Sequence, residues 1–151
     1  MKNDSMKILL SLFLCLGTSY GQIPNMAEEI TTHLEFLGFE VTLEEGKMVT
    51  THTTRLDMTI QQWEGGLLFT NFGNPTPYAL KNLKNLMRFI NKLNSKAGAA
   101  RYYLNEHNKI IIEAYYPGDY NKRSFSTFLD MWEKELTNLS NIMDEMPNYI
   151  E

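Results

Sequence analysis

The stretch that organises this chain runs from Thr76 to Tyr116 and reads TPYALKNLKNLMRFINKLNSKAGAARYYLNEHNKIIIEAYY. Its first half predicts an amphipathic helix. Thr76 is a favourable N-cap, and Pro77 suits the first helical position because its missing N–H would be unpaired there anyway. Gly98 is the expected stop of the helix. The spacing of three and four residues places one apolar stripe on it, consisting of Leu80, Leu83, Leu86, Met87, Ile90 and Leu93.

The second half of the stretch predicts a β-hairpin. Its strands are Ala100 to Leu104 and Lys109 to Tyr116, and the turn between them is Asn105 to Asn108. Asn108 tolerates the left-handed backbone that such a turn needs near its end. Alternation along the second strand divides its side chains between two faces, one with Ile110, Ile112, Ala114 and Tyr116 and the other with Ile111, Glu113 and Tyr115.

This stretch resembles the YbjN family, which comprises proposed bacterial sensory transduction regulators. The resemblance rests on three segments, Asn91-Lys92-Leu93-Asn94, Arg101-Tyr102-Tyr103-Leu104 and Ile110-Ile111-Ile112-Glu113-Ala114, and it extends roughly from Glu28 to Met143. The chain departs from the family pattern in the turn, where Asn105, His107 and Asn108 replace Asp, Asp and Gly. The resemblance implies a fold like that of type III secretion chaperones.

Length and composition indicate one globular domain. The chain has 151 residues, of which 43% are hydrophobic and 21% charged, so a packed core is expected. Its net charge of −4 argues against a nucleic-acid partner, because proteins that bind nucleic acids usually present a basic surface.

Residues 1–21 resemble a secretory signal peptide. Lys2 and Lys7 supply a positive start, and the apolar run Ile8 to Leu16 is too short to span a bilayer. Small residues precede Gln22, which would become the N-terminus. Cleavage there removes two lysines and one aspartate, a net +1, and leaves a charge of −5. We therefore expect a periplasmic or secreted protein without a stable membrane span, consisting of a single YbjN-like domain over residues 22–151.

Three alternatives concern this segment. Translation could begin at Met6 and give an equally good signal. The segment could instead be the buried first helix of a cytosolic protein. Cys15, the only cysteine, could anchor a lipid, but Leu14 stands where a small residue is needed. Without the segment the chain has no thiol for a disulfide, a nucleophile or a metal site.

The remaining pattern predicts an α+β domain, an antiparallel sheet of short strands with N-terminal, central and C-terminal helices. The first helix has a face of Ile30, Leu34 and Leu37. The last begins after Asn121 and has the stripe Phe125, Phe128, Leu129, Trp132, Leu136, Leu139 and Met143. Four strands are expected before the central helix, at Phe39–Leu43, Met48–Thr54, Asp57–Trp63 and Leu67–Phe72. The run Thr50 to Thr54 is polar on both faces, so we expect it exposed or at an edge.

The search for catalytic chemistry is negative. The histidines His33, His52 and His107 have no metal-ligand spacing and are interpreted as surface residues. There is no nucleophile elbow and no phosphate-binding glycine-rich loop. We therefore predict a protein that is not an enzyme and that has no cofactor and no metal.

Two surface features suggest binding. A basic row on the central helix could contact an acidic partner or anionic head groups, or it could be an ordinary solvated face; it consists of Lys81, Lys84, Arg88, Lys92 and Lys96. The tyrosines near the hairpin could serve recognition or only packing. From these two sets the predicted binding residues are Lys84, Arg88, Lys92, Tyr103, Tyr115 and Tyr120.

The sequence thus favours an exported, non-enzymatic module that binds a protein or peptide and acts as a chaperone or regulator. Two alternatives are a small periplasmic hydrolase with an unfamiliar site and a carrier of a small apolar ligand. The fold resemblance also implies a homodimer, for which Tyr103 and Tyr115, together with the terminal helix, would supply the contact.

Overall fold

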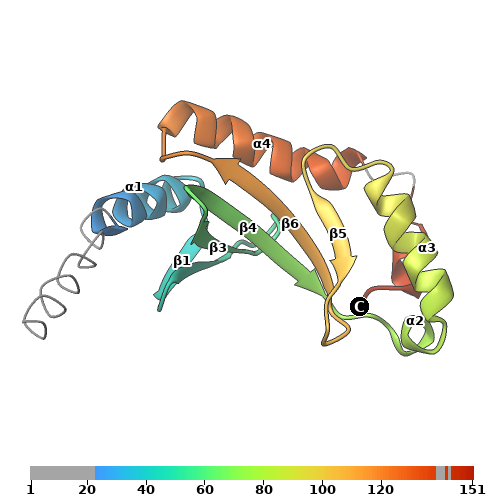
Figure 1. Ribbon diagram of the computed structural model, residues 1–151. Helices are drawn as coiled ribbons and strands as arrows, with labels where there is room; N and C mark the ends of the chain where they lie inside the picture. Colours follow the sequence, from blue (N-terminus) through green and yellow to red (C-terminus); the bar gives the residue numbers. More distant parts are fainter. Residues whose placement is uncertain (1–22, 139–141, 143) are drawn as a thin grey trace, which may run out of the picture.

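The computed structural model describes residues 23–138, 142 and 144–151 (Figure 1). One antiparallel sheet has the strand order β1-β2-β3-β4-β6-β5. Its strands are β1 (Glu40–Glu44), β2 (Lys47–Thr51), β3 (Met58–Trp63), β4 (Gly66–Gly73), β5 (Arg101–Leu104) and β6 (Ile110–Pro117). The helices are α1 (Ile23–Phe36), α2 (Pro77–Lys81), α3 (Leu83–Asn94) and α4 (Lys122–Asn138), followed by the 3-10 turn η1 (Met146–Asn148). The predicted α+β class is confirmed.

Some predictions lie outside the described residues. These are the signal peptide at residues 1–21, the side chain of Leu136, and Leu139 and Met143.

Short turns set the register of the sheet. Glu64 and Gly65 form the loop between β3 and β4, and both have positive φ angles, of 39° and 77°. That conformation matches the twist of a two-residue hairpin. β4 then pairs with β6 along its whole length, from Gly66 opposite Pro117 to Gly73 opposite Ile110. The β5–β6 turn contains the predicted left-handed Asn108, at φ 56°.

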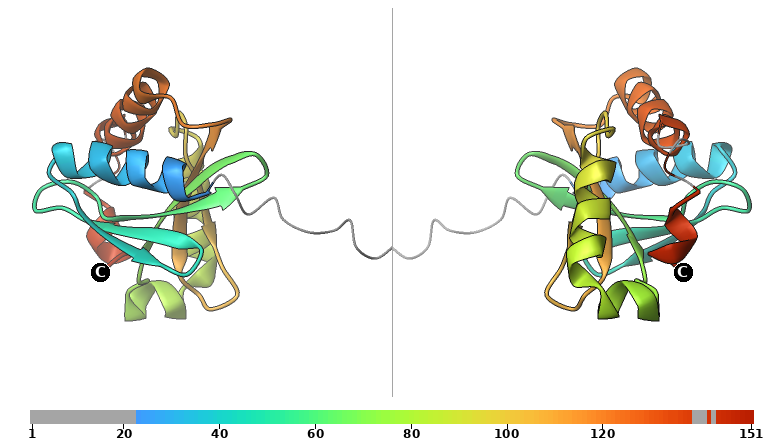
Figure 2. Two further views of the ribbon diagram at one scale, coloured as in Figure 1. Left: turned by 90° about the vertical axis from the view of Figure 1, so that its left-hand side faces the viewer. Right: turned by 90° about the vertical axis from the view of Figure 1, so that its right-hand side faces the viewer.

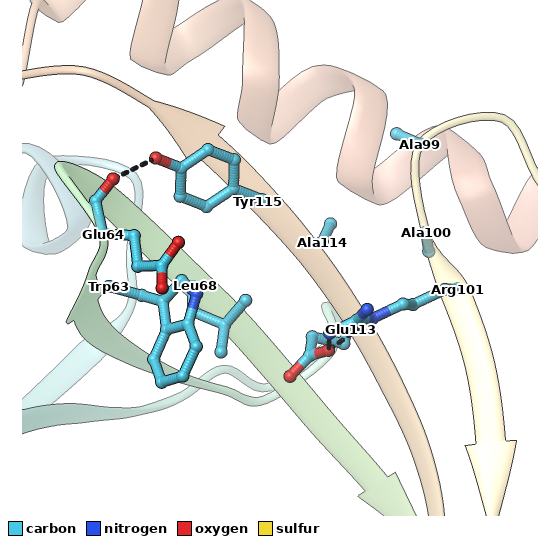
Figure 3. A pocket seen from close by; sticks show the side chains of 9 residues that line it. All are labelled: Trp63, Glu64, Leu68, Ala99, Ala100, Arg101, Glu113, Ala114 and Tyr115. Carbon is cyan, nitrogen blue, oxygen red and sulfur yellow. Dashed lines mark hydrogen bonds and ion pairs between the residues drawn. The ribbon is translucent and has the colours of Figure 1, made fainter.

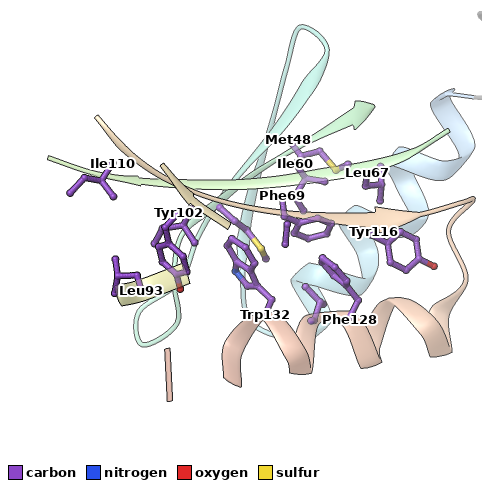
Figure 4. Packing of buried hydrophobic residues seen from close by; sticks show 14 of the residues in the cluster. Met48, Ile60, Leu67, Phe69, Leu93, Tyr102, Ile110, Tyr116, Phe128 and Trp132 are labelled. Atoms are coloured by element: carbon purple, nitrogen blue, oxygen red, sulfur yellow. The ribbon is translucent and has the colours of Figure 1, made fainter. Parts of the chain in front are cut away.

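The core lies on one face of the sheet, which we call the core face. Alternation places Leu67 and Phe69 of β4 on this face, opposite Tyr116 and Ala114 of β6. α4 packs there through Trp132 and its neighbours, and α1 and α3 complete the cover (Figures 1 and 4). Figure 2 shows the helices from both ends of the molecule. The predicted inward face of the last helix is confirmed at its four described positions, Phe125, Phe128, Leu129 and Trp132.

The central helix is two helices, not one. Asn82 breaks it, with φ −126° and ψ 51°, and its side-chain amide donates to the Tyr78 carbonyl over 2.9 Å. A side chain that takes this carbonyl competes with the helical backbone bond. The Thr76 cap is confirmed, since its hydroxyl accepts from the Ala79 N–H at 3.1 Å. The predicted stop at Gly98 is wrong, because α3 already ends at Asn94.

The break also changes the apolar stripe. Leu86, Ile90 and Leu93 are buried as predicted, together with Phe89. The other three members of the predicted stripe are exposed, namely Leu80, Leu83 and Met87. The apolar surface of α3 is therefore only partly covered, and its edge at Leu83 and Met87 faces outward.

The expectation for Thr50 is wrong. β2 is an inner strand between β1 and β3, and Thr50 is fully buried on the core face. Its hydroxyl donates to the Met58 carbonyl over 3.0 Å, which satisfies the polar group inside the core. The strand ends at Thr51 because His52 starts a turn, in which its Nδ1 accepts from the Thr54 and Arg55 amides.

The two ends of the last helical region are anchored differently. Asn121 caps α4 as predicted, since its Oδ1 accepts from the Ser124 amide at 3.2 Å. After η1 the chain runs back beside the start of α2. There the Thr76 amide donates to the Tyr149 carbonyl over 3.0 Å, and the Tyr149 ring stacks on Phe89 at 4.4 Å.

Candidate functional site

The opposite face of the sheet carries the candidate site, and we call it the uncovered face because none of the described helices packs on it. The helices α1, α3 and α4 contribute to the core on the other side. The register places on the uncovered face the side chains of Thr59, Gln61, Leu68, Thr70, Phe72, Arg101, Tyr103, Ile111, Glu113 and Tyr115. Large side chains remain open to solvent here, including Trp63 at 51% and Phe72 at 61% exposure. These exposed aromatic rings share one face of the sheet, and such rings are suited to recognition.

An ion pair joins the edge strand β5 to its neighbour β6 on this face. Arg101 of β5 lies directly opposite Glu113 of β6, and its guanidinium contacts Oε2 of the carboxylate. The Glu113 side chain is buried, at 7% exposure, whereas the Arg101 side chain is 70% exposed. The Tyr103 hydroxyl lies 3.4 Å from Oε1 of Glu113, and the Arg101 guanidinium lies over the Tyr103 ring. Burial, and next the Glu113 carboxylate, raises the pKa of Tyr103.

A hollow of about 410 Å³ adjoins this pair (Figure 3). Leu68 and Ala114 contribute to its lining, Trp63 and Tyr115 stand at one end, and the ion pair of Arg101 stands at the other (Figure 3). Its volume falls within the range of small-ligand sites. The combination of an apolar lining with a charged end can hold a side chain or short peptide segment with a polar group.

One glycine makes this hollow possible. A Cβ at Gly66 would lie 2.3 Å from the Tyr116 carbonyl oxygen and 2.6 Å from the Tyr115 hydroxyl. Only glycine therefore lets the Tyr115 ring cross the β3–β4 hairpin. The Tyr115 hydroxyl donates to the Glu64 carbonyl over 2.9 Å, which fixes the ring at the rim of the hollow.

The structure distributes the predicted binding residues over three places. Tyr103 and Tyr115 share the uncovered face, on either side of the Arg101–Glu113 pair. Alternation along the second strand predicted this side for Tyr115. Tyr120 lies on the other side of the sheet, near α1 and α4. Sequence reasoning missed Trp63, Arg101 and Glu113. The opposite charges of Arg101 and Glu113 could have signalled a cross-strand pair if the hairpin register had been known.

The basic row follows α3 only in part. Lys84, Arg88 and Lys92 are all exposed on this helix. Lys92 forms an ion pair with Glu145, which leads into η1. Lys84 and Arg88 have no ion-pair partner among the described residues.

The interpretation of His33 as a surface residue is wrong. The side chain is buried, because it lies beside Ile30 and Leu34 on the inward face of α1. Its Nδ1 is 2.9 Å from the Tyr120 hydroxyl, and its Nε2 is 3.2 Å from Ser126 Oγ. The Ser126 hydroxyl also donates to a backbone carbonyl of α4. These bonds connect α1 with α4, so they favour a structural role for Tyr120 over recognition.

His33 should make stability fall with acidification. Burial, and next the Lys122 ammonium, lowers the pKa of His33 below its usual 6.5. At pH values well above 6.5, His33 is neutral in both the folded and the unfolded protein. As the pH falls through 6.5, the unfolded chain gains its proton first, so the free energy of unfolding decreases until the folded-state pKa is passed. Urea unfolding at pH 7.5 and 5.5 measures the decrease.

The control separates His33 from the carboxylates, which also titrate. His33→Gln should show a smaller loss between the two pH values than the natural chain. His107→Gln, in the exposed hairpin turn, should keep the full loss. Equal pH dependence in His33→Gln and the natural chain would contradict the assignment.

Two further hollows bear on the alternative functions. An apolar hollow of about 210 Å³ lies between α1 and the β1–β3 strands, and it is smaller than most small-molecule sites. A hollow of about 560 Å³ lies beside His33 and Tyr120, where Glu28, Glu29 and Lys122 also line it. No group of three side chains that could hold a metal occurs in the part of the chain that the structure describes. None of the described helices is long and apolar enough to cross a membrane.

Comparisons with known proteins agree with this architecture. No protein family model matches the chain, and no curated protein is significantly similar to it. The crystal structure of YbjN from E. coli, which is described as a proposed transcription regulator, superposes with a TM-score of 0.64 at 13% identity, covering 83% of this chain and 95% of YbjN. An uncharacterized protein from Methanothermobacter thermautotrophicus superposes with a TM-score of 0.55 at 15% identity, covering 80% of this chain and 98% of that protein.

The fold and the uncovered face define an α+β domain with one helix-covered and one open sheet surface. More particularly, the chain has a YbjN-like fold, as the similarity to YbjN over most of both chains shows. The resemblance inferred from the hairpin sequence is confirmed at the level of the fold.

Proposed function

We propose that this protein is an exported, non-enzymatic module that binds a protein or peptide segment on its uncovered face. The observation that carries the proposal is the hollow between the exposed rings of Trp63 and Tyr115 and the Arg101–Glu113 pair. Aromatic rings and arginine are the residue types that dominate binding energy in protein interfaces. The signal-like segment at residues 1–21 supports a periplasmic or secreted location.

The similarity to YbjN supports a regulatory role. We infer that this role is exerted by binding a protein and not by binding nucleic acid. The net charge of −4 disfavours direct binding to nucleic acid. A chaperone-like action is equally compatible with a surface that holds an extended segment. The partner could also be a second copy of the chain. In that case Trp63 and Phe72 would have to extend the contact of Tyr103 and Tyr115, because α4 packs on the other face.

Site-specific photo-crosslinking, carried out in cells that naturally make this protein, tests the proposal. A photoreactive phenylalanine analogue is placed at Trp63 or Tyr103, and at Phe36 of α1 as the control. Phe36 is even more exposed, at 84%, but lies away from the uncovered face. We expect a defined cross-linked product from positions 63 and 103 and none from position 36, with the partner identified by mass spectrometry.

The mass of the cross-linked product distinguishes a second copy of the chain from a different protein as the partner. A product of twice the chain mass would identify the uncovered face as a homodimer interface. A product that contains a different protein would identify a protein partner. Equal or absent cross-linking at all three positions would refute binding at this face.

A further inference from the structure

The charges of this acidic chain are strongly segregated. Residues 65–105 contain no aspartate or glutamate, and they carry six positive charges, from Lys81, Lys84, Arg88, Lys92, Lys96 and Arg101. With a total of −4, the rest of the chain carries −10. Arg101 and Lys92 are paired with carboxylates, whereas Lys84 and Arg88 have no ion pair among the described residues. The segment around α3 is therefore a local site of attraction for anions.

The same exposed side of α3 carries apolar side chains. Leu83 and Met87 are 48% and 44% exposed and lie one helical turn apart. Lys84 and Arg88 each follow one residue later, so their row runs beside the apolar row. α2 also exposes Tyr78, Leu80 and Lys81. The right-hand view of Figure 2 shows α2 and α3 on the side that faces the viewer.

We propose that this side of α3 docks on the surface of an anionic lipid bilayer. Its occupant has to complement positive charge and also accept protruding apolar side chains. α3 is convex, so a rigid protein would need a matching groove to cover Leu83 and Met87. A bilayer moulds to the helix instead, since the apolar side chains enter the boundary between head groups and acyl chains while Lys84 and Arg88 reach the phosphates.

The proposed contact is a peripheral one and lies apart from the uncovered face. The ring of Tyr78 can contribute at head-group level, where amphipathic aromatic side chains are favoured. Each basic residue near an anionic surface strengthens binding roughly fivefold. Loss of the Lys84 and Arg88 charges together should therefore weaken binding roughly 30-fold. High salt should weaken it too, because it screens exposed charges.

A local fluorescent probe reports on the contact at α3 itself. The full chain carries Cys15→Ser, and a single cysteine replaces Met87 for labelling with an environment-sensitive dye. Met131→Cys is the matched control, since Met131 of α4 is 45% exposed. With vesicles of phosphatidylglycerol and phosphatidylcholine we expect a blue shift and an increase in emission at position 87 only. Pure phosphatidylcholine vesicles should give little change.

Charge variants complete the test. Lys84→Gln with Arg88→Gln should raise the lipid concentration needed for half-maximal change roughly 30-fold. Lys134→Gln, at an exposed lysine of α4, should alter it much less. Circular dichroism verifies that each variant is folded.

Three results would overturn the proposal. One is no response at position 87 to anionic vesicles at low salt. Another is an equal response at position 131. The third is a response at position 87 to soluble oligoglutamate but not to vesicles, which would assign this side of α3 to an acidic polypeptide instead.

Discussion

Replacing Trp132 by alanine should lower the free energy of unfolding by about 3–5 kcal/mol, as large-to-small changes in well-packed cores do. Trp132 is 2% exposed and joins α4 to the sheet through Phe69, with the ring centroids 6.3 Å apart. Removing the indole leaves a cavity between these two layers, which the surrounding strands cannot close. Urea unfolding followed by circular dichroism measures the loss.

Two further variants show whether the loss in Trp132→Ala comes from the missing indole. Met131→Ala, at the preceding exposed position, should cost less than about 1 kcal/mol. Trp132→Phe should cost less than Trp132→Ala, because the phenyl ring refills part of the space that the indole occupies. The loss of Nε1 itself sacrifices no bond in either variant, since this atom has no hydrogen-bond partner among the described residues. A loss below roughly 1 kcal/mol in Trp132→Ala would contradict the packing of α4.

Replacing Glu135 by alanine should cost about 2–4 kcal/mol, since charge-assisted hydrogen bonds contribute more than neutral ones. Glu135 is buried, and its carboxylate accepts from the Gly98 amide at 2.9 Å and from the Ala99 amide at 3.0 Å. These bonds tie the loop between α3 and β5 to α4. Without these bonds the backbone amides of the loop lose their hydrogen-bond partners. The loop then no longer holds the start of β5 in place.

The neighbouring acidic residue gives the control for this change. Glu133 is partly exposed and pairs with Arg55 over 2.8 Å at the surface. Glu133→Ala should cost less than about 1 kcal/mol, as exposed ion pairs contribute little. Glu135→Gln keeps one acceptor oxygen and should fall between the two alanine variants. Equal losses for Glu133→Ala and Glu135→Ala would contradict the anchoring role of Glu135.

Local sequence signals predicted most of the elements. Thr76 and Asn121 were identified as helix caps because a capping side chain bonds backbone groups only two or three residues away. The alternation along β6 placed Tyr115 on the face away from Ile110 and Ile112. These predictions depend on backbone geometry that neighbouring residues set by themselves.

The hairpin register could not be predicted in the same way. The sequence placed Lys109 in the second strand, but the strand starts at Ile110 and the turn is one residue longer. A shift of one residue changes which side chains lie opposite each other. The pair of Arg101 with Glu113, which stands at one end of the candidate site, depends on this detail.

Contacts between distant segments decided the rest. His33 is polar by type, yet it is buried because Tyr120 and Ser126, about ninety residues further along, supply partners for both ring nitrogens. Thr50 is buried in the core for the same reason, because its hydroxyl donates to the Met58 carbonyl. The sequence by itself determined most of the elements, the inward face of α4 and the fold class, since these follow from local periodicity. Only the tertiary structure decided which polar groups are satisfied inside and which apolar groups of α3 stay outside, because burial is settled by partners that the chain brings together on folding.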